Sequence, residues 1–184
     1  MAVTSRPGGI KITEFSSICQ SCAMPFMKDE DYGTESDGSR SNIYCTYCYQ
    51  NGKFTDDNCN VEKMAEIGAG MMSQMFGMPL DKARMFMQNQ ISPLKRWSGR
   101  IVPSCQSCGM PLFSPEDAGT EEDETPSYRY CVYCYQHGAF TEPDLTQDAM
   151  IEKSAPFIAS QLEMSLDKAK EMSKVFTSTL SRWK

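Results

Sequence analysis

Eight of the nine cysteines in this chain lie in four C-x-x-C pairs. A thiolate can act as a nucleophile, a redox centre or a metal ligand. When two residues separate two cysteines, one tight turn can direct both sulfurs at one ion, and a second turn completes a tetrahedron of ligands. Each half of the chain contains two such pairs with 22 residues between them, which predicts one four-cysteine metal site per half. The predicted ligands are Cys19, Cys22, Cys45 and Cys48 in the first site and Cys105, Cys108, Cys131 and Cys134 in the second.

The two halves of the chain are copies of one another. Residues 19–55 and 105–141 are identical at 22 of 37 positions, and each matched pair lies 86 residues apart without an insertion. Farther along, Arg96-Trp97 returns at the same interval as Arg182-Trp183. The sequence therefore predicts a tandem duplication. The expected boundaries are a flexible arm at 1–12, a first module at 13–97, a linker at 98–104 and a second module at 105–184.

Each module begins with a cysteine-rich part that predicts short β-hairpins. Asn51-Gly52 is a two-residue hairpin signal, and His137-Gly138 stands at the same place in the second copy. A segment of about 40 residues buries too little apolar surface to fold without a staple. A structural zinc ion contributes about 10–16 kcal/mol in small zinc-finger peptides, which is more than such a core provides.

The rest of each module predicts a helical hairpin. Apolar residues recur at helical spacing over 64–76 and over 150–162. A second helix is expected to carry an apolar seam over 80–97 in module one and over 166–183 in module two, with Ser165 as an N-cap. The expected fold class is α+β, with two zinc ribbons that are each followed by a helical hairpin.

The seams of the two hairpins suggest how the modules pack. If the seams 80–97 and 166–183 face one another, the hairpins form a pseudo-twofold four-helix centre with the ribbons outside. The chain would then be a pseudo-dimer within one monomer. Pro93 is expected to distort the last turns of the seam helix in module one, whereas its counterpart Thr179 is not.

Two other uses of the cysteine pairs compete with a zinc site. A thioredoxin-type dithiol has one C-x-x-C pair in a βαβ context, but here each module has two pairs and no such pattern. Rubredoxin-like iron sites usually have glycine after the second cysteine of each pair. Gly109 fits that rule, whereas Ala23, Tyr49 and Tyr135 do not, so the sequence favours zinc.

The remaining reactive residue types do not predict catalysis. Four thiolates close the coordination sphere, so no position stays open for water or substrate. His137 is the only histidine and matches Asn51 of the first copy, which favours a turn residue. Cys59 matches Leu145, which favours a buried apolar role. The seven methionines over 64–87 favour core packing, with an adaptable partner groove as the alternative.

The charge of the chain argues against binding to nucleic acid. The formal net charge is −6, and the loops 23–44 and 109–130 carry −3 and −5. Each zinc bound by four thiolates adds a further −2, whereas a nucleic-acid-binding ribbon needs a basic face. The N-terminus shows no secretory signal, and no apolar run reaches the roughly 18 residues of a membrane helix. We therefore expect a cytoplasmic protein whose thiols stay reduced.

The cysteine motifs resemble a known family. C-Q-S-C-[AG]-M-P at 19–25 and 105–111, followed by Y-C-x-Y-C-Y-Q-x-G-x-F-T at 44–55 and 130–141, is similar to the prokaryotic "putative zinc ribbon domain" family. The resemblance implies one zinc ion on the four cysteines of each module, and so two per chain. Ala23 departs from the usual glycine, and the double copy departs from a single-module pattern.

The expected function is that of a non-enzymatic zinc-binding protein that acts through a protein partner, in interaction or regulation. Two alternatives remain open. A nucleic-acid-binding ribbon pair would shift with DNA or RNA in a salt-dependent way. A redox-responsive zinc–thiolate sensor would release zinc on mild oxidation and recover it on reduction.

Overall fold

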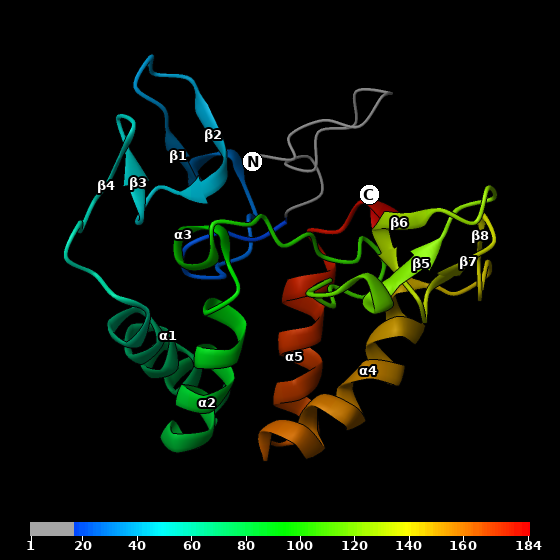
Figure 1. The fold of residues 1–184 in the computed structure, drawn as a ribbon. Helices are drawn as coiled ribbons and strands as arrows, with labels where there is room; N and C mark the ends of the chain where they lie inside the picture. The colour runs from blue at the N-terminus through cyan, green and yellow to red at the C-terminus, as the bar shows by residue number, and fades with distance from the viewer. Residues whose placement is uncertain (1–16) are drawn as a thin grey trace.

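The computed structural model describes residues 17–184, in which two similar modules each combine small antiparallel hairpins with helices (Figure 1). The arm expected at 1–12, with residues 13–16, lies outside the described residues. The predicted α+β class and the two tandem modules are confirmed.

Each ribbon contains two small sheets, and each sheet has two antiparallel strands. The strands of module one are β1 (Tyr32–Thr34), β2 (Arg40–Cys45), β3 (Tyr49–Gln50) and β4 (Lys53–Phe54). The strands of module two are β5 (Ala118–Thr120), β6 (Pro126–Cys131), β7 (Tyr135–Gln136) and β8 (Ala139–Phe140). Strands pair β1 with β2, β3 with β4, β5 with β6 and β7 with β8, so module two repeats the topology of module one.

The turn between β3 and β4 follows from its sequence. Asn51 and Gly52 both have positive φ values, of 51° and 77°, as a type I′ turn requires. His137 and Gly138 adopt the same conformation between β7 and β8, with φ values of 51° and 78°. His137 is therefore the turn residue that the sequence predicted. Its exposed imidazole Nδ1 lies 2.7 Å from a carboxylate oxygen of Glu124.

Two antiparallel helices follow each ribbon. They are α1 (Val61–Phe76) and α2 (Leu80–Ile91) in module one, and α4 (Gln147–Leu162) and α5 (Leu166–Thr177) in module two. The side chain of Asn60 caps α1 by accepting a hydrogen bond from the N–H of Lys63. Ser165 caps α5 in the same way, as predicted. Cys59, just before α1, is 9% exposed, which confirms its buried role.

The second helix of each module ends earlier than the sequence predicted. Both α2 and α5 end at equivalent positions, Ile91 and Thr177, although only module one has a proline two residues later. The prediction that Pro93 distorts the last turns of its helix while Thr179 leaves the other helix undisturbed is therefore wrong for module two, where the helix ends at the same place. Leu94, which is fully buried, starts a short separate helix, α3 (Lys95–Ser98). In module two the turn η4 (Ser181–Trp183) replaces α3. Tertiary contacts with the ribbon, described below, turn the chain at this point.

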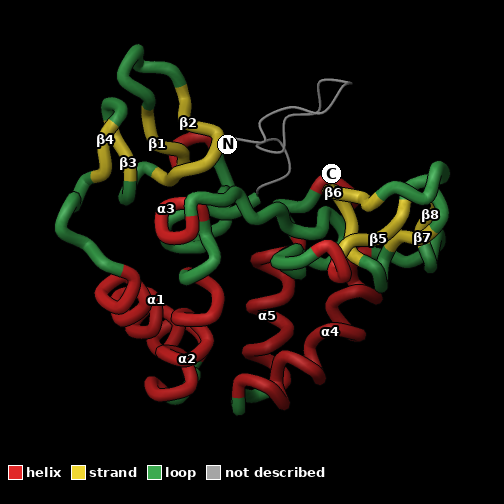
Figure 2. The backbone as a smooth tube through the Cα atoms, in the orientation of Figure 1, coloured by secondary structure: helices red, strands yellow, loops and turns green. Residues whose placement is uncertain are grey.

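The helices of both modules form one centre, but the two seam helices α2 and α5 do not make its main contacts with each other, although the sequence had suggested that they would. Helix α1 packs against α5, and α2 packs against α4, in addition to the pairs α1–α2 and α4–α5 within the modules. Leu162 and Met172 of module two belong to the same buried cluster as Met72 and Phe76 of module one. Because α1 corresponds to α4 and α2 to α5, the two contacts between modules are related by a pseudo-twofold axis. Figure 2 shows the four long helices gathered on one side of the molecule, with the two ribbons apart from each other on the other side and α3 beside the first ribbon.

The methionines of module one serve two roles. Those at 64, 72, 78 and 87 are buried in the core, which confirms packing as their role. Met71, Met75 and Met85 are more than half exposed and lie on the surface of the hairpin. No helix among residues 17–184 has the length and apolar character needed to cross a bilayer.

Candidate metal centres

The first cysteine pair of each module lies in a tight turn closed by backbone hydrogen bonds. The N–H of Ala23 donates to the carbonyl of Cys19 over 2.9 Å, and the N–H of Cys19 donates to Met24 over 2.8 Å. Ala23 has a positive φ of 63°, a conformation that a Cβ atom disfavours. Gly109 occupies the same place in module two with a φ of 81°. The turn thus demands a left-handed residue, and module one meets that demand with some strain.

The second cysteine pair lies in the turn that joins β2 to β3. The N–H of Cys48 donates to the carbonyl of Cys45 over 3.0 Å, and the N–H of Thr55 donates to Cys48 over 3.0 Å. The hydroxyl of Thr55 also donates to the carbonyl of Tyr47, which lies between the two cysteines. The hairpin β3–β4 therefore folds back onto the turn and fixes it.

Further hydrogen bonds bring the two turns of each module together. The N–H of Gln20 donates to the carbonyl of Ile43 over 2.7 Å, and that of Gln106 donates to Arg129 over 2.8 Å. The N–H of Cys45 points at the sulfur of Cys19, 3.3 Å away. Each strand that leads into the second turn is thus held against the first turn.

The structure groups all eight predicted cysteines into two clusters. In each cluster the four sulfur atoms lie within 4.8 Å of one another. The Cys22 and Cys45 sulfurs are 3.7 Å apart, and the Cys108 and Cys131 sulfurs are 3.6 Å apart. Zinc–sulfur bonds of about 2.3 Å in a tetrahedron require sulfur–sulfur distances of about 3.8 Å. The two clusters therefore fit two zinc ions. Among the described residues, no histidine, aspartate or glutamate joins either cluster.

The thiols are buried where an isolated thiolate would be costly. Cys19, Cys45, Cys105 and Cys131 are fully buried. Burial raises the pKa of the Cys19 thiol well above its ordinary value. Hydrogen bonds from neighbouring thiols, that of Cys19 first, lower the pKa of Cys48. A buried group of four sulfurs can ionise fully only beside a positive charge, which a divalent cation supplies.

A pair of residues from the end of each module anchors the first turn, and the sequence did not predict this role. The indole N–H of Trp97 donates to the carbonyl of Ser21 over 2.8 Å. The guanidinium of Arg96 donates to the Ser21 hydroxyl, and the Arg96 N–H donates to the carbonyl of Gln20. Ser21 and Gln20 are the two residues between Cys19 and Cys22. The sequence did contain a sign of this role, because Arg-Trp recurs after 86 residues. We interpreted both pairs as part of an apolar helix seam.

The same arginine also holds the second turn. Its guanidinium lies 4.0 Å from the ring centre of Phe54 and donates to the carbonyl of Asp56. Phe54 packs edge-on against Tyr44 and Tyr49. Arg96 therefore connects the two halves of the ribbon through one planar cation.

Module two repeats this anchor in detail. The indole of Trp183 donates to the carbonyl of Ser107 over 2.8 Å, and Arg182 donates to the Ser107 hydroxyl over 2.9 Å. The guanidinium of Arg182 also donates to the carbonyl of Glu142 and lies 3.8 Å from the ring centre of Phe140. Two copies with diverged surroundings thus preserve the same contact.

Close backbone packing at a glycine is a second feature that the sequence did not reveal. A Cβ atom at Gly33 would lie 2.2 Å from the carbonyl oxygen of Tyr49, and one at Gly119 would lie 2.1 Å from that of Tyr135. Strands β1 and β5 therefore cross over the second turn at a distance that only glycine permits. The only sign of this packing in the sequence is that a glycine occurs at the same position in both copies, at Gly33 and Gly119.

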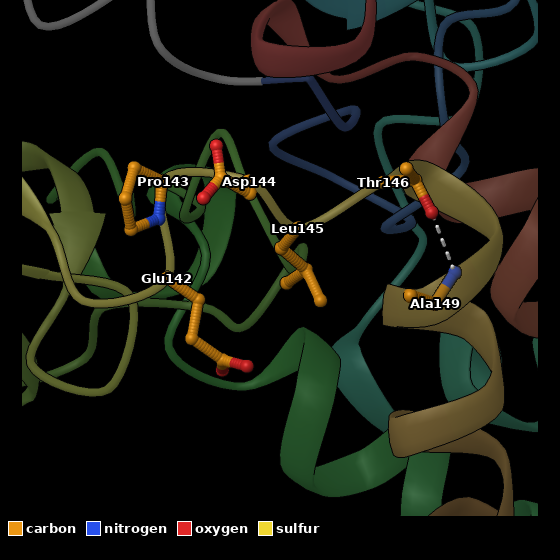
Figure 3. A pocket seen from close by; sticks show the side chains of 6 residues that line it. All are labelled: Glu142, Pro143, Asp144, Leu145, Thr146 and Ala149. Atoms are coloured by element: carbon orange, nitrogen blue, oxygen red, sulfur yellow. Dashed lines mark hydrogen bonds between the residues drawn. The ribbon is translucent and has the colours of Figure 1, made fainter.

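A shallow hollow lies away from both clusters. It has a volume of about 460 Å³ and is formed where the ribbon of module two meets α4 (Figure 3). Its lining is Glu142, Pro143, Asp144, Leu145, Thr146 and Ala149. Thr146 uses its hydroxyl to cap the N–H of Ala149, and Arg182 holds the backbone of Glu142. The hollow thus contains carboxylates, apolar groups and one hydroxyl, that of Thr146, which caps α4.

Two four-thiol clusters, each with three buried cysteines and each on a pair of turns beside small hairpins, define a zinc ribbon protein. A family model described as "putative zinc ribbon domain" matches residues 18–98 and again residues 104–184. The chain belongs to this family and contains its domain twice, which confirms the resemblance and the duplication seen in the sequence. No curated protein and no solved structure matches the chain.

Proposed function

We propose that the protein is a non-enzymatic zinc protein whose two metal sites hold a surface for protein binding. The proposed ligands are Cys19, Cys22, Cys45 and Cys48 for one ion and Cys105, Cys108, Cys131 and Cys134 for the other. The fit of four sulfurs, three of them from buried cysteines, to one tetrahedron in each cluster supports this assignment. Bound zinc supplies charge compensation and a fixed geometry there, and four thiolates leave no position for substrate.

The module boundaries follow from the same proposal. We assign one zinc ribbon and one helical hairpin to 13–97 and another to 105–184, with 98–104 between them. Each of the two modules contains one cluster of four cysteines, one hairpin turn with two positive φ values, and one Arg-Trp anchor. A cytoplasmic, reducing location belongs to the proposal, because oxidised cysteines would not bind zinc.

One observation carries the proposal of protein binding. Tyr47 and Tyr133 lie at the same position of the second cysteine turn, and their exposed fractions are 74% and 76%. Hydrogen bonds to the backbone hold both turns, so little backbone entropy is lost when the ring is covered. Tyrosine is enriched where proteins bind one another, since it combines a large apolar ring with a hydroxyl. With two zinc ions bound, the formal charge falls from −6 to about −10, which favours a partner with a basic rim.

The test compares paired aromatic substitutions in the full chain. A Tyr47→Ala/Tyr133→Ala variant should keep two zinc ions per chain by elemental analysis. In cells it should cross-link to much less partner protein than the wild type does. Phe157→Ala is the matched control, because Phe157 is 69% exposed but lies on α4, away from the turns. Equal cross-linking by the wild type and the tyrosine variant would reject the proposed surface. Captured material that is lost on nuclease treatment or at high salt would instead identify a nucleic acid as the partner.

A further inference from the structure

The two cysteine clusters are connected through a short segment between the modules. We define the strap as Val102, Pro103 and Ser104, three buried residues that directly precede Cys105. The side-chain amide of Gln20 donates to the carbonyl of Val102 over 3.1 Å, and the N–H of Val102 donates back to the Gln20 amide oxygen over 3.0 Å. This paired contact satisfies both polar groups of the Val102 backbone, as a strand partner would.

Gln20 belongs to the first metal centre. It lies between Cys19 and Cys22, it is fully buried, and its backbone N–H is bonded to Ile43. Its carbonyl accepts the N–H of Arg96, the residue that anchors the same turn. The position of the Gln20 side chain is thus set by the fold of the first cluster.

The other end of the strap belongs to the second metal centre. The carbonyl of Pro103 accepts the N–H of Leu112, which follows the second cluster's first cysteine turn. Ser104 is 1% exposed, and its hydroxyl lies 2.8 Å from the hydroxyl of Ser17, two residues before Cys19. Two hydrogen-bonded links therefore join the turn around Cys19 to the residues that lead into Cys105.

The equivalent amide in module two makes a different set of contacts. The Gln106 amide nitrogen donates to the carbonyl of Ser104, and the amide oxygen accepts the N–H of Ser181. Both partners lie in or next to its own module. The duplicated glutamine thus reaches across to the Val102 backbone in module one, whereas in module two it bonds to the Ser104 backbone and to Ser181 beside its own cluster.

We propose that the two zinc sites are positively coupled through this strap, so that zinc in one site raises the affinity of the other. The inference rests on the proposal that both clusters bind zinc. Without an ion, a ribbon of this size does not hold its turns. Gln20 then ceases to be fixed, and the buried N–H and carbonyl of Val102 lose their partner, at a cost in free energy. The segment that presents Cys105 is consequently less ordered, and linkage requires the same effect in the reverse direction.

The first experiment measures site-two affinity with site one either loaded or destroyed. Zinc binding to the full chain is followed by competition with a chromogenic chelator, and Cys19→Ser/Cys22→Ser removes site one. We expect site two to bind zinc at least about fivefold more weakly in that variant. Cys105→Ser/Cys108→Ser should weaken site one by the same factor. Affinities that stay within twofold of the wild-type values in both variants would overturn the coupling.

The second experiment assigns the coupling to the strap and keeps all eight cysteines, so it does not depend on a variant that fails to fold. Native mass spectrometry counts chains with zero, one and two zinc ions when one equivalent is added. Coupling makes the one-zinc species scarcer in the wild type than in Gln20→Ala, in which the amide is absent. Lys82→Ala is the control, because it removes the Lys82–Glu163 ion pair between the modules but leaves the strap intact.

The outcomes separate the two proposals. If the one-zinc fraction is the same in the wild type and in Gln20→Ala, the strap does not carry the coupling. If Lys82→Ala raises that fraction as much as Gln20→Ala does, the helical interface carries it instead, and the strap assignment is wrong. If the wild type binds no zinc at all, the proposed function itself fails, whatever the variants show.

Discussion

The indole nitrogen of Trp97 donates a 2.8 Å hydrogen bond to the carbonyl oxygen of Ser21, inside the turn that holds Cys19 and Cys22. These residues are 76 positions apart in the sequence, and the contact recurs between Trp183 and Ser107 over the same distance. The end of each module therefore closes back onto its first cysteine turn. Each metal centre depends on the helical part of its module as well as on its cysteines.

Removing this hydrogen bond should weaken the metal centre. Trp97→Phe keeps an aromatic ring but leaves the carbonyl of the fully buried Ser21 without its indole partner, at a cost of about 1–3 kcal/mol in stability. We expect zinc affinity at site one to fall about tenfold or more, as it does when supports of metal ligands are lost. Chelator competition measures the change, and Trp183→Phe should produce it at site two. An unchanged affinity in both variants would show that the anchor is dispensable.

The residue after the first cysteine pair should respond in opposite ways in the two modules. Ala23→Gly relieves a left-handed conformation and should stabilise the zinc-bound protein by about 1 kcal/mol. Gly109→Ala should destabilise it by about 1–2 kcal/mol. A Cβ atom at Gly109 would meet only Leu180, at 3.8 Å, so its cost is conformational rather than steric. Denaturant unfolding with zinc present measures both changes, and a destabilised Ala23→Gly would contradict this explanation.

Substitution at the crossing glycines should be far more damaging. A Cβ atom in Gly33→Ala or Gly119→Ala would lie little more than 2 Å from a backbone oxygen, so the strand must move. We expect a loss of roughly 3 kcal/mol or more and one zinc ion fewer per chain, since the second turn loses its cover. Gly70→Ala is the control. No neighbouring group lies within 4 Å of the methyl group that this substitution adds, so it should stabilise α1 by up to about 1 kcal/mol.

Removal of the metal should separate the stability of the ribbons from that of the helices. A chelator should abolish amide-hydrogen protection in β1–β8, because the sheets have only two strands each and depend on the ion. The helical circular dichroism should fall only in part, since α1, α2, α4 and α5 share a common packed centre. Loss of all helical signal together with the ribbons would show that the centre cannot stand alone.

Acid should have the same effect as a chelator. Zinc binds thiolates, so binding releases protons, and the affinity must fall as the pH falls. Zinc release followed by an indicator dye should therefore precede the loss of helical signal on acidification. If the helices unfold before zinc is released, the ribbons do not depend on the metal in the proposed way.

Local features of this protein could be predicted from the sequence because each depends on residues close together in the chain. The two-residue cysteine spacing, the Asn51-Gly52 turn and the apolar period of α1 each correspond to a local conformation with few alternatives. The internal repeat added a comparison that distinguished retained residues, such as the eight paired cysteines, from replaced ones, such as Cys59.

Only the tertiary structure decided what happens after Ile91 and Thr177. The apolar period continues to Trp97 and Trp183, so periodicity alone favours a longer helix. The helix ends instead because the buried Leu94 and the indole of Trp97 gain more from packing and hydrogen bonding against the ribbon than from another helical turn. Leu80, expected in the seam, is 40% exposed for a related reason, as the core face of α2 follows Ala83, Met87 and Ile91.

The contact between Gln20 and Val102 likewise could not be predicted from the sequence. The glutamine in each C-Q-S-C motif is identical in type and local setting, yet Gln20 pairs with the Val102 backbone across the module boundary. Its counterpart Gln106 bonds Ser104 and Ser181 beside its own cluster. A side chain takes the polar partner that the folded chain brings within reach, and here that partner lies 82 residues away. Sequence spacing determined which residues can hold a metal; the packing of the two modules determined how the metal centres are supported and joined.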